Sequence, residues 1–159
     1  MPARGGWMAL VRFAYVGDGV SLYGEGGLAY ATPGSVGLDL RACIAEEEAL
    51  IPAGGRLAVP TGVAVEPMEP DIAGFIYARS GLGAKQGLTV AQGVGVIDPD
   101  YRGELLVVLL NTSPEPRVIR RGDRVAQLVF QPVCRVQLEQ AERLGETRRG
   151  SGGFGHTGR

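Results

Sequence analysis

The sequence has few of the residue types that bind transition metals, and it lacks long apolar runs. Its 159 residues include one histidine and two cysteines, Cys43 and Cys134, which lie far apart and in no metal-binding or redox spacing, so a zinc cluster is excluded. No stretch approaches the roughly 18 consecutive apolar residues of a membrane helix. Residues 1–13 are too short and too interrupted by glycine to predict a secretory signal. We therefore expect a cytoplasmic protein without membrane contact, in which both thiols are reduced and buried.

Lysine is nearly absent, since Lys85 is the only one, and the net charge is −1 at pH 7. So small a net charge argues against binding nucleic acid through an overall electrostatic field. The charges are unevenly distributed, because residues 1–116 carry 7 basic and 13 acidic side chains whereas residues 117–159 carry 9 basic and 4 acidic ones. An arginine fork matches phosphate oxygens with two parallel hydrogen bonds. This pattern predicts a small polyanion as partner, and a biased genome composition is the alternative explanation of the arginine excess.

Sustained helical periodicity is also missing. Short runs of Val, Leu, Ile and Ala are interrupted by Gly and Pro every eight to twelve residues, which is typical of an antiparallel sandwich or barrel. One short helix is predicted over 81–86, capped by Ser80 and ended by Gly87. We expect one all-β domain over 10–147, preceded by a loose extension over 1–9. The predicted strands are 10–16, 37–42, 56–65, 74–78, 105–111, 125–130 and 133–140.

The last twelve residues, 148–159, contain five glycines and a single apolar side chain, Phe154. Glycine at this density costs too much backbone entropy for a helix or strand, so the segment alone is typical of a frayed terminus. It also carries Arg148, Arg149, a histidine and a threonine. Together with the phenylalanine, these groups suit stacking on a flat apolar face and gripping phosphate oxygens. The rest of the sequence favours this second interpretation, a flexible arm that becomes ordered on a ligand.

Three internal segments combine charged groups with tight turns. In 79–83, an arginine and a serine at the start of a helix present N–H and hydroxyl groups to an anion, although this segment alone indicates no more than an ordinary helix cap. In 93–103, Pro99 excludes a regular central strand and places Asp98 on a tight turn. Residues 121–128 form a turn that leads into a strand, and in isolation their charges would indicate solvated turn residues.

Together with residues 33–42 and the tail, these segments resemble the five ordered motifs of the trimeric deoxyuridine triphosphatases (dUTPases). The matching stretches are PGSVGLDLRA at 33–42, ARSGLGAKQGL at 78–88, GVGVIDPDYRGE at 93–104, RGDRVAQLVFQPV at 121–133 and RGSGGFGHTG at 149–158. Each motif alone is only suggestive, but the five occur in order and cover nearly everything from Ala31 onward. The resemblance implies a jelly-roll-like β-barrel that assembles as a homotrimer.

In this family each active site lies at a subunit interface, and the C-terminal arm of one subunit, here 148–159, closes over a neighbour's site. The resemblance implies hydrolysis of dUTP to dUMP and pyrophosphate, which limits dUTP and supplies dUMP for thymidylate synthesis. By its place in the third motif, Asp98 would orient and deprotonate the water that attacks the α-phosphorus. Because a carboxylate is a weak base, its positioning matters more than its basicity.

The resemblance also implies how dUTP is held. Arg79 and Ser80 contact the phosphate chain, Gln127 adds an amide donor, and Tyr101 packs beneath the deoxyribose and excludes a 2′-hydroxyl. The backbone of residues 93–98 is implied to recognise uracil. The wrong base would leave a buried backbone amide unpaired, which costs about 1–3 kcal/mol. The implied substrate contacts are Arg79, Ser80, Gly81, Gln92, Val96, Ile97, Tyr101, Gln127, Arg149, Phe154, Gly155, His156 and Thr157.

Within the arm, Arg149 and Thr157 are implied to hold the γ-phosphate, and Phe154 to stack on uracil. Two positions depart from the family pattern. Gln92 stands where some relatives have asparagine, which leaves its contact with the base open. His156 stands where a serine is usual, which leaves one contact with the γ-phosphate open.

Magnesium is expected because of the substrate. A hard cation that bridges phosphate oxygens neutralises the charge that develops in the transition state. In the family the ion is held mainly by phosphates and water, so no direct protein ligand is expected here. Asp39 either acts on the ion through water or braces the barrel, and the sequence leaves both alternatives open.

Two other functions are compatible with such a fold. A dCTP deaminase needs a glutamate on the strand after the Asp98 turn, whereas 105–110 is uninterrupted apolar sequence. A non-catalytic module that binds nucleotide or protein would have no need of a residue for the attacking water. An assay for pyrophosphate and ammonia released from dUTP distinguishes the three functions.

Overall fold

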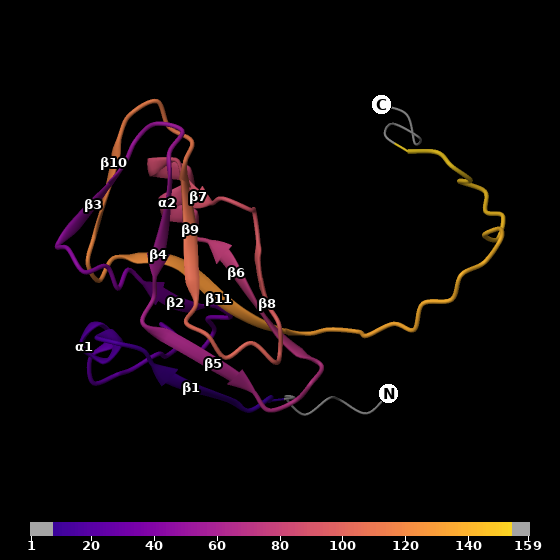
Figure 1. The fold of residues 1–159 in the computed structure, drawn as a ribbon, viewed down its shortest axis with the longest axis horizontal. Helices are drawn as coiled ribbons and strands as arrows, with labels where there is room; N and C mark the ends of the chain where they lie inside the picture. The colour runs from indigo at the N-terminus through magenta and orange to yellow at the C-terminus, as the bar shows by residue number, and fades with distance from the viewer. Residues whose placement is uncertain (1–7, 154–159) are drawn as a thin grey trace.

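The computed structural model describes residues 8–153, and residues 11–132 of these form a barrel of short antiparallel strands with two short helices. Its largest sheet has four strands in the order β2 (Leu38–Arg41), β11 (Arg124–Pro132), β6 (Ile72–Ala78) and β8 (Gly95–Ile97). A second sheet has the order β4 (Arg56–Pro60), β9 (Leu106–Asn111) and β7 (Leu88–Val90). Figure 1 shows these sheets as walls of one barrel. The expected all-β, jelly-roll-like class is confirmed.

Two strand pairs complete the barrel. One joins β1 (Val11–Tyr15) to β5 (Val63–Pro67), and the other joins β3 (Glu48–Ile51) to β10 (Arg117–Arg120). The helices are α1 (Gly19–Tyr23) and α2 (Ser80–Gln86). No helix in the described part of the chain is long and apolar enough to cross a membrane.

The core lies between these sheets and follows from alternating sequence. Inward-facing residues at every second position of β2, β5 and β9 are buried, while their neighbours are partly exposed, as a strand with one covered face requires. Among the fully buried side chains are Leu40, Val63, Val65, Ile76, Val107 and Leu128. Burying such aliphatic side chains is the main favourable term in the stability of the barrel.

The predicted helix is confirmed, with one correction at its start. Helix α2 ends at Gly87, whose φ of 70° is left-handed and whose N–H donates to the carbonyls of Gly83 and Leu82. Ser80, however, is the first helical residue and not the cap. The capping position is held by Arg79, which makes no side-chain capping hydrogen bond. The Ser80 hydroxyl is therefore left for another partner at the exposed start of the helix.

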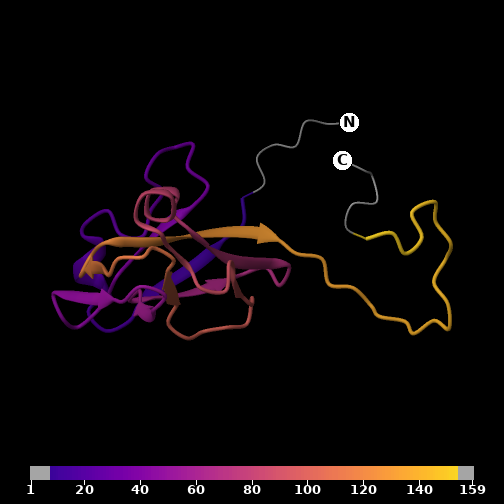
Figure 2. The same ribbon diagram turned by 90° about the horizontal axis from the view of Figure 1, so that it is seen from above.

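Two of the strand predictions are wrong. The stretch 56–65 is not one strand, because the turn at Thr61 and Gly62 divides it into β4 and β5. The stretch 133–140 is not a strand, because its one backbone bond to the barrel among the described residues is at its first residue, where the Val133 N–H donates to the Asp71 carbonyl (2.7 Å). After Pro132 the chain leads away from the barrel (Figures 1 and 2). Strands β3, β7, β8 and β10 were not predicted.

The expectation of two buried thiols is also wrong. Cys43 is partly exposed and Cys134 is exposed. Cys134 follows the end of β11, in the segment that leaves the barrel, so no sheet covers it. The apolar neighbours that suggested burial belong to the unpaired stretch 133–140. The limits of the loose N-terminal extension and of the C-terminal arm stay predictions.

The turn between β4 and β5 joins several parts of the barrel. The buried Tyr23 hydroxyl donates to the Thr61 carbonyl (3.0 Å) and accepts from the Arg41 N–H (3.0 Å). The Gly62 N–H donates to Glu104 Oε1 (2.7 Å). Gly62 has a left-handed φ of 68°, and a Cβ there would lie 2.5 Å from the Gly19 Cα, so only glycine fits.

Tyr23 makes the stability of this fold sensitive to high pH. Burial raises the pKa of Tyr23 to about 12 from 10.0, and only 8% of the residue is exposed. Above pH 10 the unfolded chain loses this proton before the folded chain does, so stability falls as pH rises from 10 towards 12. Between pH 9 and 11 we expect a loss of about 1 kcal/mol from this residue.

The measurement is the free energy of unfolding in urea for wild type and Tyr23→Phe, at one protein concentration and several pH values. Other tyrosines titrate equally in both proteins, so the difference between the two proteins isolates Tyr23. The advantage of wild type should shrink by about 1 kcal/mol over this range. A difference that stays constant from pH 9 to 11 would contradict the buried, neutral state of Tyr23.

Candidate active site

Strand register brings the first, second and fourth sequence motifs together on one edge of the four-stranded sheet. On β11, Gln127 lies opposite Asp39 of β2 on one side and opposite Tyr77 of β6 on the other. Arg79 follows β6 directly and precedes α2. Residues separated by up to 88 positions in the sequence thus become neighbours because β11 runs between β2 and β6.

These motifs line a polar cavity of about 240 Å³. Four of the predicted substrate contacts lie in it, and they come from the segment after β6 and from β11. The lining residues are Ala31, Ser35, Val36, Gly37, Asp39, Arg79, Ser80, Gly81 and Gln127. A guanidinium, two hydroxyls and an amide facing one small hollow are suitable partners for phosphate oxygens.

Asp39 fixes the direction of the arginine in this cavity. Its Oδ1 lies 2.9 Å from Arg79 Nε and its Oδ2 lies 3.1 Å from Arg124 Nη1. Arg79 Nη1 also donates to the Arg124 carbonyl (3.2 Å). The Asp39 side chain is only 23% exposed, so these charge-assisted bonds are stronger than those of a surface pair. Of the two alternatives for Asp39, these contacts favour bracing, with two arginines as the groups that are braced.

Gln127 is held between β6 and the loop before β2. Its Nε2 donates to the Ala78 carbonyl (3.1 Å). A Cβ at Gly37 would lie 2.5 Å from Gln127 Oε1 and 3.1 Å from its Cβ. The position of the Gln127 amide in the cavity therefore requires glycine at 37. Neither Gly37 nor Arg124 was predicted as a site residue. Gly37 lies inside the first motif and Arg124 inside the fourth, but only the strand register shows which residues they contact.

The third motif forms a turn elsewhere on the molecule. Residues 98–101 close a β-turn in which the Tyr101 N–H donates to the Asp98 carbonyl (3.1 Å), as the proline at 99 favours. Asp98 is exposed, and Tyr101 is 43% exposed with its hydroxyl donating to the Glu104 carbonyl (3.0 Å). Gln92 and Val96 are exposed and Ile97 is half-buried. None of these residues lines the polar cavity.

The length of β6 separates this turn from the polar cavity. Strand β8 pairs with the beginning of β6, where Ile97 lies opposite Gly74, and Arg79 follows the end of β6. Five residues of strand between these points span about 17 Å at 3.3 Å per residue. One chain therefore brings Arg79, Ser80, Gly81 and Gln127 together but keeps Asp98 and Tyr101 at the other end of the strand.

The C-terminal arm adds little to either half within this chain. Arg149 is exposed, and its Nε donates to the Gly152 carbonyl (2.8 Å) three residues along the arm. Figures 1 and 2 show residues 133–153 lying apart from the barrel. The predicted contacts of Phe154, Gly155, His156 and Thr157 lie outside the described residues. No group of three or more metal-binding side chains of the His, Cys, Asp or Glu type occurs among residues 8–153.

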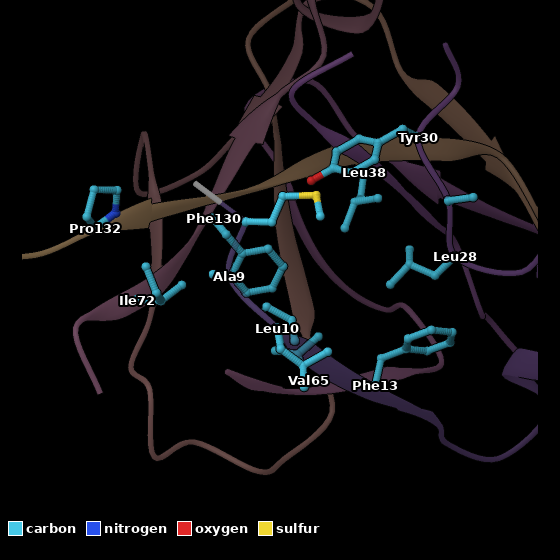
Figure 3. A pocket seen from close by; sticks show the side chains of 13 residues that line it. Ala9, Leu10, Phe13, Leu28, Tyr30, Leu38, Val65, Ile72, Phe130 and Pro132 are labelled. Carbon is cyan, nitrogen blue, oxygen red and sulfur yellow. The ribbon is translucent and has the colours of Figure 1, made fainter. Parts of the chain in front are cut away.

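A larger cavity of about 610 Å³ lies away from the predicted site residues. Its walls come from β1, β2, β5, residues 28–30, the beginning of β6 and the end of β11, and Figure 3 shows their side chains around the cavity. They are almost all apolar: Met8, Ala9, Leu10, Val11, Phe13, Leu28, Ala29, Tyr30, Leu38, Val65, Ile72, Phe130 and Pro132. Such a wall offers nothing to phosphate and suits an apolar partner.

The fold defines an all-β barrel protein, and its polar cavity carries side chains that suit phosphate oxygens. Comparison with known proteins shows its family. The dUTPase family model matches residues 27–158. A deoxyuridine 5'-triphosphate nucleotidohydrolase of Methylococcus capsulatus is 52% identical over 130 residues, which cover 82% of this chain and 85% of that protein. The chain belongs to the dUTPase family.

Two solved structures show the same fold. A dUTPase of Staphylococcus bacteriophage 80alpha, determined with dUpNHpp, has a TM-score of 0.80 at 20% identity and covers 94% of this chain and 99% of its own. The dUTPase of phage phi11 of S. aureus, described with a structural Mg(II) ion, has a TM-score of 0.72 at 19% identity and covers 86% and 99%.

The close approach of Gly37 to Gln127 gives a test of the cavity. In Gly37→Ala the new methyl group must displace the Gln127 amide, which can move because it is the end of a flexible side chain. The fold should therefore survive, while affinity for inorganic triphosphate falls about fivefold through loss of one hydrogen bond. Calorimetric titration of both proteins with triphosphate measures the change.

Gly34→Ala is the matched control, because a Cβ at Gly34 meets nothing within 4 Å and lies in the same loop. It should bind triphosphate as wild type does. Equal affinity of Gly37→Ala and Gly34→Ala would show that the Gln127 amide does not contact the phosphates.

Proposed function

We propose that this protein hydrolyses dUTP to dUMP and pyrophosphate at sites that are assembled between subunits of a homotrimer. Membership of the dUTPase family supports the reaction. The observation that carries the shared site is the strand register, because β6 holds the phosphate-binding cavity and the Asp98 turn about 17 Å apart in one chain. Two halves of a site that cannot meet within a chain can meet between chains of a closed oligomer.

The polar cavity is the half that binds the triphosphate. Arg79 offers a guanidinium whose direction is already set by Asp39, so little side-chain entropy is lost when it binds an anion. The hydroxyl of Ser80 and the amide of Gln127 add neutral donors, and the open start of α2 at Gly81 leaves room for the phosphate chain. Donors fixed before binding stabilise developing charge without reorganisation.

The Asp98 turn is the half that supplies the water. Its exposed carboxylate orients and deprotonates a water molecule for attack on the α-phosphorus. The P–O bond to the bridging oxygen then breaks, and pyrophosphate leaves. Since a carboxylate is a weak base, most of its effect comes from holding the water in line with the leaving group.

Selectivity for the base and the sugar belongs to residues 92–101, the segment that leads into and includes the Asp98 turn. Backbone groups over 93–98, flanked by the side chains of Gln92, Val96 and Ile97, recognise the uracil edge. Tyr101 stands beside the sugar and leaves no room for a 2′-hydroxyl. Its ring is oriented by the bond from its hydroxyl to the Glu104 carbonyl. A deaminase is not favoured, because β9, the strand that follows this turn, carries no glutamate.

The residues of the polar cavity would hold magnesium only through the substrate. Mg²⁺ keeps several waters and is usually bound through substrate phosphates with one or two carboxylates at most. The donors around the polar cavity fit this arrangement, because the oxygens of Asp39 face arginines and the cavity otherwise offers hydroxyl and amide groups. The ion, when bound, neutralises charge on the phosphate oxygens. Asp39 would then influence the ion only through Arg79 or through water.

Exposed apolar surface supports the trimer. After Pro132 the chain leaves the barrel carrying Val136, Leu138 and Leu144, which are 70%, 89% and 90% exposed. The large apolar cavity of Figure 3 adds to this exposed apolar surface. Apolar patches left uncovered by a single barrel mark contacts between proteins. The final arm, with Arg149, Phe154, Gly155, His156 and Thr157, would close over a neighbour's site. A cytoplasmic location, with neither nucleic acid nor membrane as partner, belongs to the same proposal.

The role of Asp98 is tested by Asp98→Asn. The amide has the same shape but cannot accept the proton of the attacking water, so turnover should fall at least 100-fold. Binding of a non-hydrolysable dUTP analogue should stay within threefold of wild type. Pyrophosphate release and calorimetric titration measure the two quantities. Asp100→Asn is the control, because it removes a charge two residues away on the same turn, and it should keep most of the activity. If Asp98→Asn keeps turnover within tenfold of wild type, the assignment of Asp98 is wrong.

The shared site is tested by mixing two inactive variants. Asp98→Asn and Arg79→Ala damage different halves, so trimers formed from equal amounts of both should regain about a quarter of wild-type activity if each site takes one half from each of two subunits. The subunits are mixed in urea and refolded together. Light scattering confirms the trimer before pyrophosphate release is measured.

Arg79→Ala mixed with Gln127→Ala is the control for this experiment. Both residues lie in the same half, so no mixed trimer can restore a complete cavity, and activity should stay at the level of the separate variants. No recovery in the mixture of Asp98→Asn with Arg79→Ala would mean that one chain supplies both halves.

A further inference from the structure

The side chain of Arg102 bonds to the backbone of the Asp98 turn, residues 98–101. Its Nη1 donates to the Pro99 carbonyl (2.7 Å) and to the Tyr101 carbonyl (3.1 Å). One guanidinium nitrogen thus joins two carbonyls of the segment that carries both Asp98 and Tyr101. Bonds from a charged donor to carbonyl oxygens are stronger than neutral ones, so the turn is held in one shape by this side chain.

The side chain of Arg102 is itself held by the carboxylate of Glu66 on β5. Arg102 Nε lies 3.4 Å from Glu66 Oε1, and Glu66 Oε2 lies 3.8 Å from Arg12 Nη1 on the paired strand β1. Glu66 therefore has an arginine on each side. Of these two arginines, only Arg102 contacts the Asp98 turn, whereas Arg12 lies beside the other oxygen of the Glu66 carboxylate.

The other end of the turn is attached independently. The Tyr101 hydroxyl donates to the Glu104 carbonyl, and the Glu104 carboxylate accepts from the Gly62 N–H (2.7 Å). Gly62 belongs to the turn between β4 and β5. The Asp98 turn is thus bound to β5 through Arg102 and Glu66, and to the start of β5 through Glu104. Removing Arg102 leaves the second attachment, so the barrel should still fold.

We propose that Arg102, held by Glu66, is a positioning residue that sets the placement of Asp98 and Tyr101 in the reaction. The proposal rests on the proposed function, because it is through those two residues that Arg102 affects dUTP hydrolysis. Arg102 is half exposed, so its contribution is orientation of the turn and not burial of a large area. A misplacement of about 1 Å in a reacting group costs about 100-fold in rate.

The test compares Arg102→Met, Arg102→Lys, Glu66→Gln and Arg12→Met. Methionine keeps an apolar stem of similar length and removes all donors. Arg102→Met should lower kcat about 10- to 100-fold, change the affinity for a non-hydrolysable dUTP analogue less than threefold, and reduce the preference for dUTP over UTP. Arg102→Lys retains one donor and should recover part of kcat, and Glu66→Gln should lower kcat less than Arg102→Met does.

Arg12→Met is the matched control, because it removes an arginine from the same carboxylate without touching the turn. It should keep the wild-type kcat and the wild-type preference for dUTP. If Arg102→Met keeps both within twofold of wild type, the proposal is wrong. Equal losses in Arg12→Met and Arg102→Met would also overturn it, since they would assign the effect to surface charge. If Arg102→Met does not fold, Glu66→Gln decides, and an unchanged kcat there overturns the proposal.

Hydrogen exchange separates this proposal from the proposed function. The Tyr101 amide, bonded to the Asp98 carbonyl, should exchange at least fivefold faster in Arg102→Met than in Arg12→Met whether or not the protein hydrolyses dUTP. A wild-type protein without dUTPase activity would refute the function and leave this exchange result standing. Equal exchange rates in the two variants would refute the positioning of the turn and leave the function standing.

Discussion

The antiparallel pairing of β6 with β11 on one side and β8 on the other decides where the parts of the site can lie. The pairing with β11 places Gln127 beside the end of β6, next to Arg79. The pairing with β8 places Ile97, and therefore Asp98, beside the beginning of β6. A strand of fixed rise cannot bring its two ends together. The same ladder that builds each half of the proposed site therefore keeps the halves apart within one chain, and under the proposed function a neighbouring subunit joins them.

In the proposed site, each half is held in position by an ion pair between an arginine and a carboxylate. Asp39 directs Arg79 towards the polar cavity, and Glu66 holds Arg102 over the Asp98 turn. Arginine suits both tasks because its planar fork can bind a carboxylate and still present donors to a second partner. A reaction whose base is weak depends on placement more than on acidity or basicity. This dependence explains why a small barrel uses charged pairs to fix two short polar segments.

Much of the fold could be predicted from the sequence, and four of the predicted substrate contacts, Arg79, Ser80, Gly81 and Gln127, do line one cavity. Motif order predicted the barrel, and Gly87 predicted the end of α2. The strand predicted over 133–140 failed because an apolar run forms a strand only beside a partner strand, and among the described residues no strand pairs with this stretch beyond Val133. Strands β3 and β10 were missed because their charged ends, such as Glu48 and Arg120, resemble solvated loops until they pair with each other. The contacts of Asp39 with Arg79 and Arg124 could not be predicted, because they depend on register between segments that are 40 and 85 residues away.

The most direct measurement of the shared site is a crystal structure of the protein with magnesium and a non-hydrolysable dUTP analogue. If β6 keeps the halves apart, the phosphate chain will contact Arg79, Ser80 and Gln127 of one subunit, while the water in line with the α-phosphorus will contact Asp98 of another. The barrel of each subunit will keep the strand register described above. An α-phosphate within reach of both Arg79 and Asp98 of the same chain would contradict the assembly of the site between subunits.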